Sequence, residues 1–228
     1  PRPAIASEHP GPSSPAQGAD YTAQVLDALT ANPKVWAKTV LLLMFDENDG
    51  FFDHVPPPAP PSRDATGALL GGSTVDLTGE HHDVRNPSES MDVPMYVGRP
   101  YGLGPRVPMY AISPWSRGGW VNSQVFDHTS VIRFLEARFG VMEPNLSPWR
   151  RAVCGDLTTC FDFRAPNRGK PPTLPATRET AARARAMLKT TRPPTPATLI
   201  APVQAPGVRP SRALPYVLEA NLTLDAGV

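Results

Sequence analysis

A continuous apolar run that ends in acidic residues constrains this chain more than any other feature. Residues 40–45 are apolar at every position, and Asp46, Glu47, Asn48 and Asp49 follow directly. Such a run is typical of a strand buried on both faces of a mainly parallel sheet. In open α/β sheets the chemistry lies just beyond the carboxyl ends of the strands. We therefore expect a metal or phosphate-handling site here, with a solvated Asp-Gly turn as the simpler alternative.

The pattern before and after this strand predicts a layered α/β domain. Residues 18–31 space their apolar side chains as a helix does, and Asn32 with Pro33 ends that helix. A helix followed by a buried strand is the building block of such a domain. Residues 106–112 have the composition of a second, short strand.

A further helix is predicted over residues 130–139. Asp127 or Thr129 can cap its first turn, and Gly140 fits its end because glycine accepts a left-handed conformation without penalty. The spacing gives this helix one apolar face, which consists of Val131, Ile132, Leu135 and Phe139.

Proline divides the chain into a folded part and a linker. The sequence holds 30 prolines, and they are concentrated in a few stretches. Residues 55–91 lack periodicity, which indicates either a long functional loop or a partly disordered one. We expect a catalytic part over 1–165, a Pro-rich linker over 166–212 with one basic helical piece near 178–189, and the opening strand of a further domain over 213–228.

Charge and cysteine content restrict the partners and the compartment. A net charge of +1 gives no field for a nucleic acid, and no apolar segment approaches the length of a membrane span. Cys154 and Cys160 flank a five-residue loop. This spacing favours a local disulfide in an oxidising compartment, with two free thiols as the alternative. A zinc site is disfavoured because no other Cys or His lies near in sequence.

Several other residues admit both a site role and a simpler one. His81 and His82 lie in a polar loop, where exposure to solvent is more common than metal ligation. Asp127 and His128 open a helix, either as a cap with its neighbour or as part of the site. Thr129 and Ser130 are better explained as capping residues than as a catalytic nucleophile. Packing in the core or in loops explains three tryptophans better than a choline cage does, and they are Trp115, Trp120 and Trp149.

Two non-enzymatic functions compete with a phosphate-handling one. The Asp-Glu-Asn-Asp-Gly segment suggests a calcium-binding loop. Aligning Gly50 with the EF-hand glycine, however, puts Phe45 at the first ligand position and Pro56 at the last, where neither can bind calcium. A secreted surface-binding or scaffold protein is the other candidate, and the Pro-rich tail is what suggests it.

Long motifs follow one another in a fixed order over residues 1–165. They are SEHPGPSSPAQGADYT, FDENDGFFDHVPPPAPPS, GPRVPMYAISPWSRGGWV, VFDHTSVIRFLEARFG and LSPWRRAVCGDLTTCFDF. Together they resemble the bacterial phosphatidylcholine-type phospholipase C family, which includes non-haemolytic phospholipases C and related acid phosphatases.

The resemblance implies an alkaline-phosphatase-like α/β core, export as a secreted or periplasmic protein, and one divalent metal ion. It implies hydrolysis of phospholipid at a membrane surface into diacylglycerol and a phosphorylated head group such as phosphocholine. By this analogy Asp46 and Glu47 bind the metal, and His9 contacts the substrate phosphate. His54 and His128 also match family motifs, either as phosphate contacts or as supports of the site.

The family pattern also includes an early Glu-Asn pair that completes the metal site, and a Thr or Ser nucleophile. Both precede the motifs found here. We therefore expect this chain to be the middle-to-late part of a catalytic domain, with little or no activity alone. Within enzymes, a broad-specificity acid phosphatase is the alternative to a phospholipase C.

Overall fold

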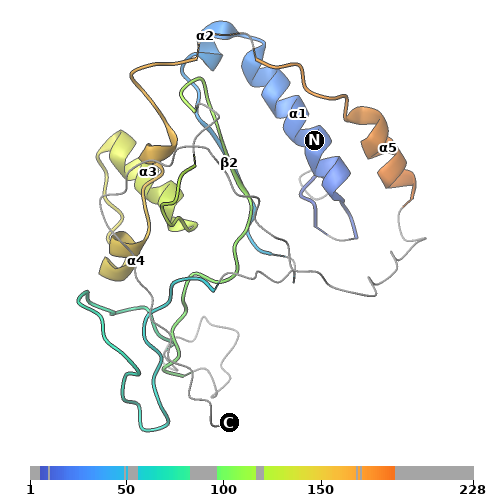
Figure 1. Cartoon of the computed structure of the whole chain (residues 1–228). Coiled ribbons are helices and arrows are strands. Elements are labelled where there is room, and N and C mark those ends of the chain that lie inside the picture. The colour runs from blue at the N-terminus through green and yellow to red at the C-terminus, as the bar shows by residue number, and fades with distance from the viewer. Residues whose placement is uncertain are drawn as a thin grey trace. The chain divides into compact units, whose positions relative to one another are not determined.

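The architecture combines helices with a small sheet (Figure 1). The computed structural model describes residues 6–9, 11–48, 50, 56–82, 97–116, 121–167, 169 and 171–187. They form two compact units. Unit 1 contains the described residues up to 41, those of 112–115 and those from 164 onward, and unit 2 contains the others. A mixed α/β composition was predicted, and the structure confirms it.

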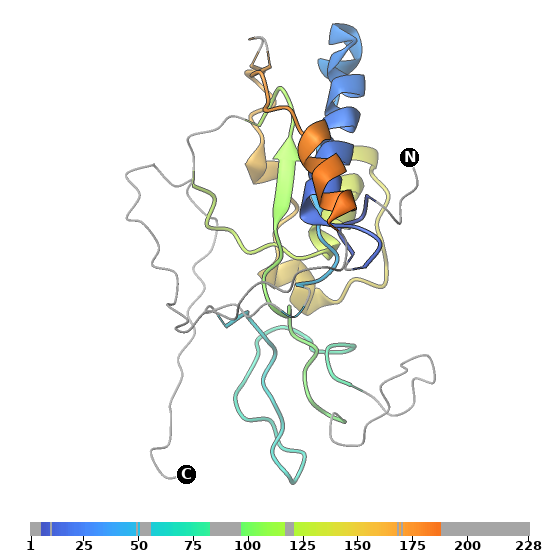
Figure 2. The same ribbon diagram turned by 90° about the vertical axis from the view of Figure 1, so that its right-hand side faces the viewer.

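Unit 1 is built from α1 (Pro15–Thr30), α2 (Pro33–Trp36) and α5 (Arg178–Ala186). Ser14 caps α1 by accepting a hydrogen bond from the amide of Gln17, and proline occupies the first turn. These signals explain why α1 begins earlier than its apolar spacing indicates. The views in Figures 1 and 2 both show α5 beside α1, and Thr177 Oγ1 donates to Asp20 Oδ1 at 2.8 Å. The predicted basic helical piece is therefore a packed helix.

The sheet of the described residues consists of β1 (Leu41–Met44) and β2 (Met109–Ile112). Just past β1, the amide of Phe45 donates to the carbonyl of Pro108 at 3.2 Å. At the opposite end, Ser113 Oγ donates to the carbonyl oxygen of Thr39 at 2.8 Å. The end of β1 therefore lies beside the start of β2, and the two strands run antiparallel.

This pairing corrects two expectations for the apolar strand. A mainly parallel sheet was predicted, yet the neighbour that the described residues give β1 is antiparallel. Burial on both faces was also predicted, but the leucines of β1 are only half-buried and Met44 is 39 % exposed. The physical reason is that two strands and the described helices do not cover both faces of β1.

Unit 2 packs around α3 (Thr129–Phe139), α4 (Pro148–Val153) and the short 3₁₀ helix η3 (Thr158–Cys160). The left-handed backbone of Gly140, with φ of 69°, ends α3 as predicted. Four apolar side chains form the buried core of the unit, and they are Trp149, Cys154, Leu157 and Phe161.

The apolar face predicted for α3 is not the one that packs in this structure. Phe134 lies 5.4 Å from Phe161 between ring centroids, and Ser130 is fully buried. Ile132, Leu135 and Phe139 are instead exposed. The reason is that helical spacing identifies apolar positions without identifying which of them meet a neighbour.

The long connection between β1 and β2 is described over residues 56–82 and 97–108, and these stretches contain only isolated bridges, Arg63 with Leu69 and His81 with Pro100. The end of the predicted linker and the strand predicted over 213–228 lie outside the described residues. No helix in the described part of the chain is long and apolar enough to cross a membrane.

Candidate functional site

The turn after β1 carries the acidic pair that we predicted to bind a metal. β1 ends at Met44, so Asp46 and Glu47 lie beyond the strand, and both are exposed. Neighbouring residues within a strand point to opposite faces, which would separate the two carboxylates. Because the chain has left the strand before Asp46, that obstacle is removed. Asn48 is half-buried, and Asp49 lies outside the described residues.

His128 contacts the backbone immediately before the acidic pair. Its Nε2 atom lies 2.9 Å from the carbonyl oxygen of Phe45. A carbonyl oxygen can only accept, so Nε2 carries the proton and donates it here. Phe45 is also bonded through its amide to Pro108. His128 therefore contacts the backbone that leads into Asp46, and its role in a site stays a prediction.

Asp127 fixes the start of α3 on which His128 sits. Its Oδ1 atom accepts from Thr129 Oγ1 at 2.6 Å and from the amide of Ser130 at 3.2 Å. Ser130 Oγ returns a contact by accepting from the amide of Asp127 at 3.1 Å. These are the bonds of a helix cap. The capping role predicted for these polar residues is confirmed.

Arg150 links this cap to the long connection. Its Nη1 donates to Asp127 Oδ2 at 2.8 Å, its Nε donates to Glu80 Oε1 at 3.1 Å, and its Nη2 donates to the carbonyl of Gly102 at 3.1 Å. Desolvation alone would lower the Arg150 pKa, but the hydrogen bond to Asp127 and the charges of Glu80 and Asp127 outweigh it and raise that pKa. One cation thus holds three segments that are distant in sequence.

Glu80 is the most deeply buried partner of Arg150. Its residue is 2 % exposed, and Oε1 accepts from Ser147 Oγ at 2.5 Å as well as from Arg150. Its Oε2 atom is buried and has no hydrogen-bond partner among the described residues. A carboxylate removed from water in this way depends on the opposite charge beside it. Glu80 is therefore held in place by Arg150 and Ser147.

The two cysteines correct another prediction. Neither forms a disulfide in the structure, although their spacing favoured one. Cys154 is buried at the end of α4, whereas Cys160 Sγ accepts from Asn122 Nδ2 at 3.5 Å. Burial, and then the negative charge of Asp127, raise the pKa of the Cys154 thiol to about 12. The two sulfur atoms are thus directed to different partners, and the structure favours the alternative of two thiols over a disulfide.

His9 lies in unit 1, at the turn that leads into α1. The turn is closed by a hydrogen bond from the amide of Glu8 to Ser13 Oγ and by one from the amide of Ser13 to the carbonyl of His9, both at 3.0 Å. The carboxyl of Glu8 packs so close to Gly18 that any Cβ there would collide with it. Burial raises the pKa of Glu8. A tightly bonded turn therefore presents His9, which is exposed.

The remaining candidates act as packing residues. His81 Nε2 lies 3.0 Å from the carbonyl oxygen of Pro61. The ring centroids of His82 and Tyr101 lie 4.1 Å apart. Both histidines are half-buried, so the expectation of solvated side chains was wrong: each ring has a partner within the long connection. Trp149 belongs to the core, as predicted.

The predicted site residues fall into both units. His9 belongs to unit 1, and Asp46, Glu47 and His128 belong to unit 2. Within the described ranges, no three His, Cys, Asp or Glu side chains form a cluster that could bind a metal. Asp46 and Glu47 are thus a partial set of oxygen ligands, and their convergence with His9 stays a prediction. His54 and Trp120 lie outside the described residues.

Sequence reasoning missed Arg150 and Glu80. They are 70 positions apart in sequence, and although Arg150 lies in one of the family motifs, nothing in that motif indicates a contact with Glu80. One local signal was available, because Ser147 followed by Pro148 is the start pattern of a helix. That pattern could have identified α4, which carries Arg150.

Comparison with known protein families assigns the chain. The model described as the Phosphoesterase family matches residues 2–142, which is more than half of the chain. This chain belongs to the Phosphoesterase family.

Curated relatives of this phosphoesterase carry phospholipase C names. The chain is 60 % identical to non-hemolytic phospholipase C of Pseudomonas aeruginosa, covering 99 % of this chain and 32 % of the relative. It is 47 % identical to hemolytic phospholipase C of the same organism, covering 96 % and 28 %. Non-specific phospholipase C1 of Arabidopsis thaliana is 29 % identical, covering 70 % and 27 %. The resemblance drawn from the motifs is confirmed, and the chain spans about a third of the length of these relatives.

Proposed function

We propose that this phosphoesterase contributes to a site that hydrolyses phospholipid phosphodiesters, as a phospholipase C does. The observation that carries the proposal is the 60 % identity, over nearly the whole chain, to a protein named non-hemolytic phospholipase C. The products would be diacylglycerol and a phosphorylated head group such as phosphocholine, with water as the final acceptor. The position of an acidic pair just past β1 supports it further.

In this proposal Asp46 and Glu47 bind one divalent cation. Their exposed carboxylates beyond the strand are hard oxygen ligands of the kind that such ions prefer. When bound, the cation would stabilise the negative charge on the phosphate oxygens and lower the pKa of a coordinated hydroxyl. The relatives' names, which describe phosphoric ester cleavage, fit this chemistry.

The histidines of this chain would have separate tasks. His9, presented by the bonded turn before α1, would donate a hydrogen bond to a phosphate oxygen. His128 would hold the carbonyl of Phe45, and with it the direction in which the chain enters Asp46. His54 follows the acidic pair by a few residues and is proposed as a phosphate contact or a support.

The wider setting is also part of the proposal. An alkaline-phosphatase-like layered core would place further strands beside β1, and the enzyme would be secreted or periplasmic and act at a membrane surface. The support is the family membership and the antiparallel strand pair that carries the acidic turn.

Metal binding can be measured on this chain directly. We expect calorimetric titration with Mn²⁺, Zn²⁺ or Ca²⁺ to show one site, which Asp46→Asn and Glu47→Gln each weaken by at least about tenfold because a ligand is lost. Asp27→Asn and Glu179→Gln make the same chemical changes on exposed helix surfaces of unit 1 and serve as controls. Equal affinity in all four variants would contradict the metal assignment.

The reaction can be tested in a chimera. This chain would replace the matching region of the Pseudomonas aeruginosa non-hemolytic phospholipase C, so that the rest of the relative is present. We expect cleavage of a phosphorylcholine diester, and a loss of about a hundredfold in kcat with Asp46→Asn, because charge stabilisation at the phosphate is removed. A preference for phosphomonoesters would favour an acid phosphatase instead. A fully active Asp46→Asn chimera would exclude the proposed site.

A further inference from the structure

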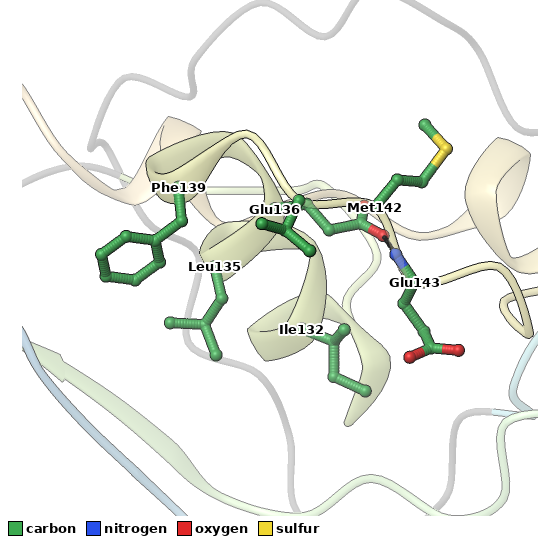
Figure 3. Close-up of a pocket in the computed structure, with 7 residues that line it drawn as sticks. Ile132, Leu135, Glu136, Phe139, Met142 and Glu143 are labelled. Atoms are coloured by element: carbon green, nitrogen blue, oxygen red, sulfur yellow. Dashed lines mark hydrogen bonds between the residues drawn. The ribbon is translucent and has the colours of Figure 1, made fainter.

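An apolar face of unit 2 lies uncovered along one side of α3. Figure 3 shows Ile132, Leu135 and Phe139 directed to the same side of the helix. They line a hollow of about 390 Å³ together with Val141 and Met142 from the following loop. The exposed fractions of these five residues rise along the chain from 41 % to 72 %. Such a contiguous apolar surface usually marks a contact site.

This face is additional to the one with which α3 already packs. Phe134 meets Phe161, Ser130 is fully buried, and Arg133 Nη1 donates to the carbonyl of Arg151 at 3.0 Å. A helix at the surface of a complete domain needs one apolar face against the core. A helix with apolar residues on two sides is typical of one that is buried between two neighbours.

The polar edge of the hollow consists of Glu136, which is paired with Arg151, and Glu143, whose carboxyl accepts from Asn145. Glu136 accepts from Arg151 Nη1 and Nη2, each at 2.9 Å, and its Oε1 also accepts from the amide of Glu143. The charged side chains that line the hollow are thus acidic, whereas an anionic membrane attracts clusters of basic residues. The face therefore fits an apolar polypeptide surface better than charged lipid.

The strand pair leaves apolar surface open as well. Met44 of β1 is 39 % exposed and Tyr110 of β2 is 52 % exposed. A two-stranded sheet is marginal alone and becomes stable with further strands or a helix against it. The exposed side of α3 and the strand pair thus both present apolar surface among the described residues, in a chain that spans about a third of its relatives' length.

From these observations we infer that the exposed face of α3 is a docking surface for the polypeptide that corresponds to the rest of the relatives' sequence. Ile132, Leu135 and Phe139 form its centre, and the loop through Met142 extends it. The inference depends on the apolar surface and on family membership, and it does not depend on which metal or head group the site takes.

Cysteine labelling tests this surface without relying on activity. In a Cys160→Ser background, Phe139→Cys and Leu135→Cys would react with a maleimide in this chain alone and in the chimera with the Pseudomonas aeruginosa relative. Cys154 adds little background because it is buried. Leu70→Cys is the matched control, since Leu70 is 64 % exposed and lies away from α3 in the sequence.

We expect both α3 cysteines to react about tenfold or more slowly in the chimera than in the isolated chain, with the control unchanged, because a covered thiol reacts only during local opening. Equal rates in both proteins would overturn the inference. If the α3 cysteines became more protected from maleimide as the concentration of the isolated chain rose, the face would be assigned to a second copy. Protection that requires phosphatidylcholine vesicles would assign it to lipid. Either result would also overturn it.

Discussion

Arg150 is the residue on which the buried polar contacts of unit 2 converge. It is the cation that pairs with Glu80, of which 2 % is exposed, and with Asp127, which caps α3. Removing one partner of such a pair leaves an uncompensated charge out of water. The residue therefore matters more for stability than its own partial exposure suggests.

We expect Arg150→Met to destabilise the chain by about 3 kcal/mol, the magnitude found when one partner of a buried ion pair is deleted. Urea unfolding would measure this. Arg138→Met is the control, because Arg138 lies on the exposed end of α3 over the ring of Phe139. Adding Glu80→Gln to Arg150→Met should restore part of the loss. A single variant as stable as its control would show that the pair contributes nothing.

At the scale of residues, the sequence predicts local bonds and misses distant ones. The cap of Asp127 on Ser130 spans three positions and follows from helix-start rules. The contact of Arg150 with Glu80 depends on how the long connection folds back, and no periodicity encodes that path. The disulfide failed for the same reason, because close spacing does not decide where each sulfur points.

At the scale of elements, one ion pair joins α3 to α4. Glu136 on α3 accepts two hydrogen bonds from Arg151 on α4. These bonds, followed by the one from the amide of Glu143, lower the pKa of Glu136 from 4.5 to about 2. A carboxyl whose pKa is lower in the folded state stabilises the fold above its unfolded pKa and loses that effect as the pH falls.

The contribution of ionised Glu136 to the free energy of unfolding should therefore be complete above pH 4.5 and lost as the pH falls towards about 2. We expect the stability difference between the wild-type chain and Glu136→Gln to shrink across this window in a pH series of urea unfolding curves. Glu179→Gln on α5, an exposed glutamate of another helix, should show no such window. A difference that stays constant from pH 5 to pH 2 would contradict the pairing.

The elements themselves were largely predictable because their signals are local. Apolar spacing identified α1 and α3, and continuous apolar runs identified β1 and β2 within a few residues. The surroundings of these elements were not predictable in the same way. The half-burial of β1 and the exposed side of α3 depend on which neighbours the chain provides.

At the scale of the whole molecule, motif order carried more information than periodicity. It gave the family, which the comparison confirmed, whereas the assembly of the two units follows from no local pattern. The candidate metal ligands were found because they follow a strand directly. Their partners cannot be identified by the same rule, because ligands from other segments meet only through the tertiary fold.

The strand pair has a consequence for how the long connection tolerates changes in length. Its closing bond, from Phe45 to Pro108, ties together both ends of the long connection. Insertions and deletions inside a segment anchored in this way leave its base unmoved. Changes inside that segment can thus leave Asp46 in its position beside an unaltered anchor.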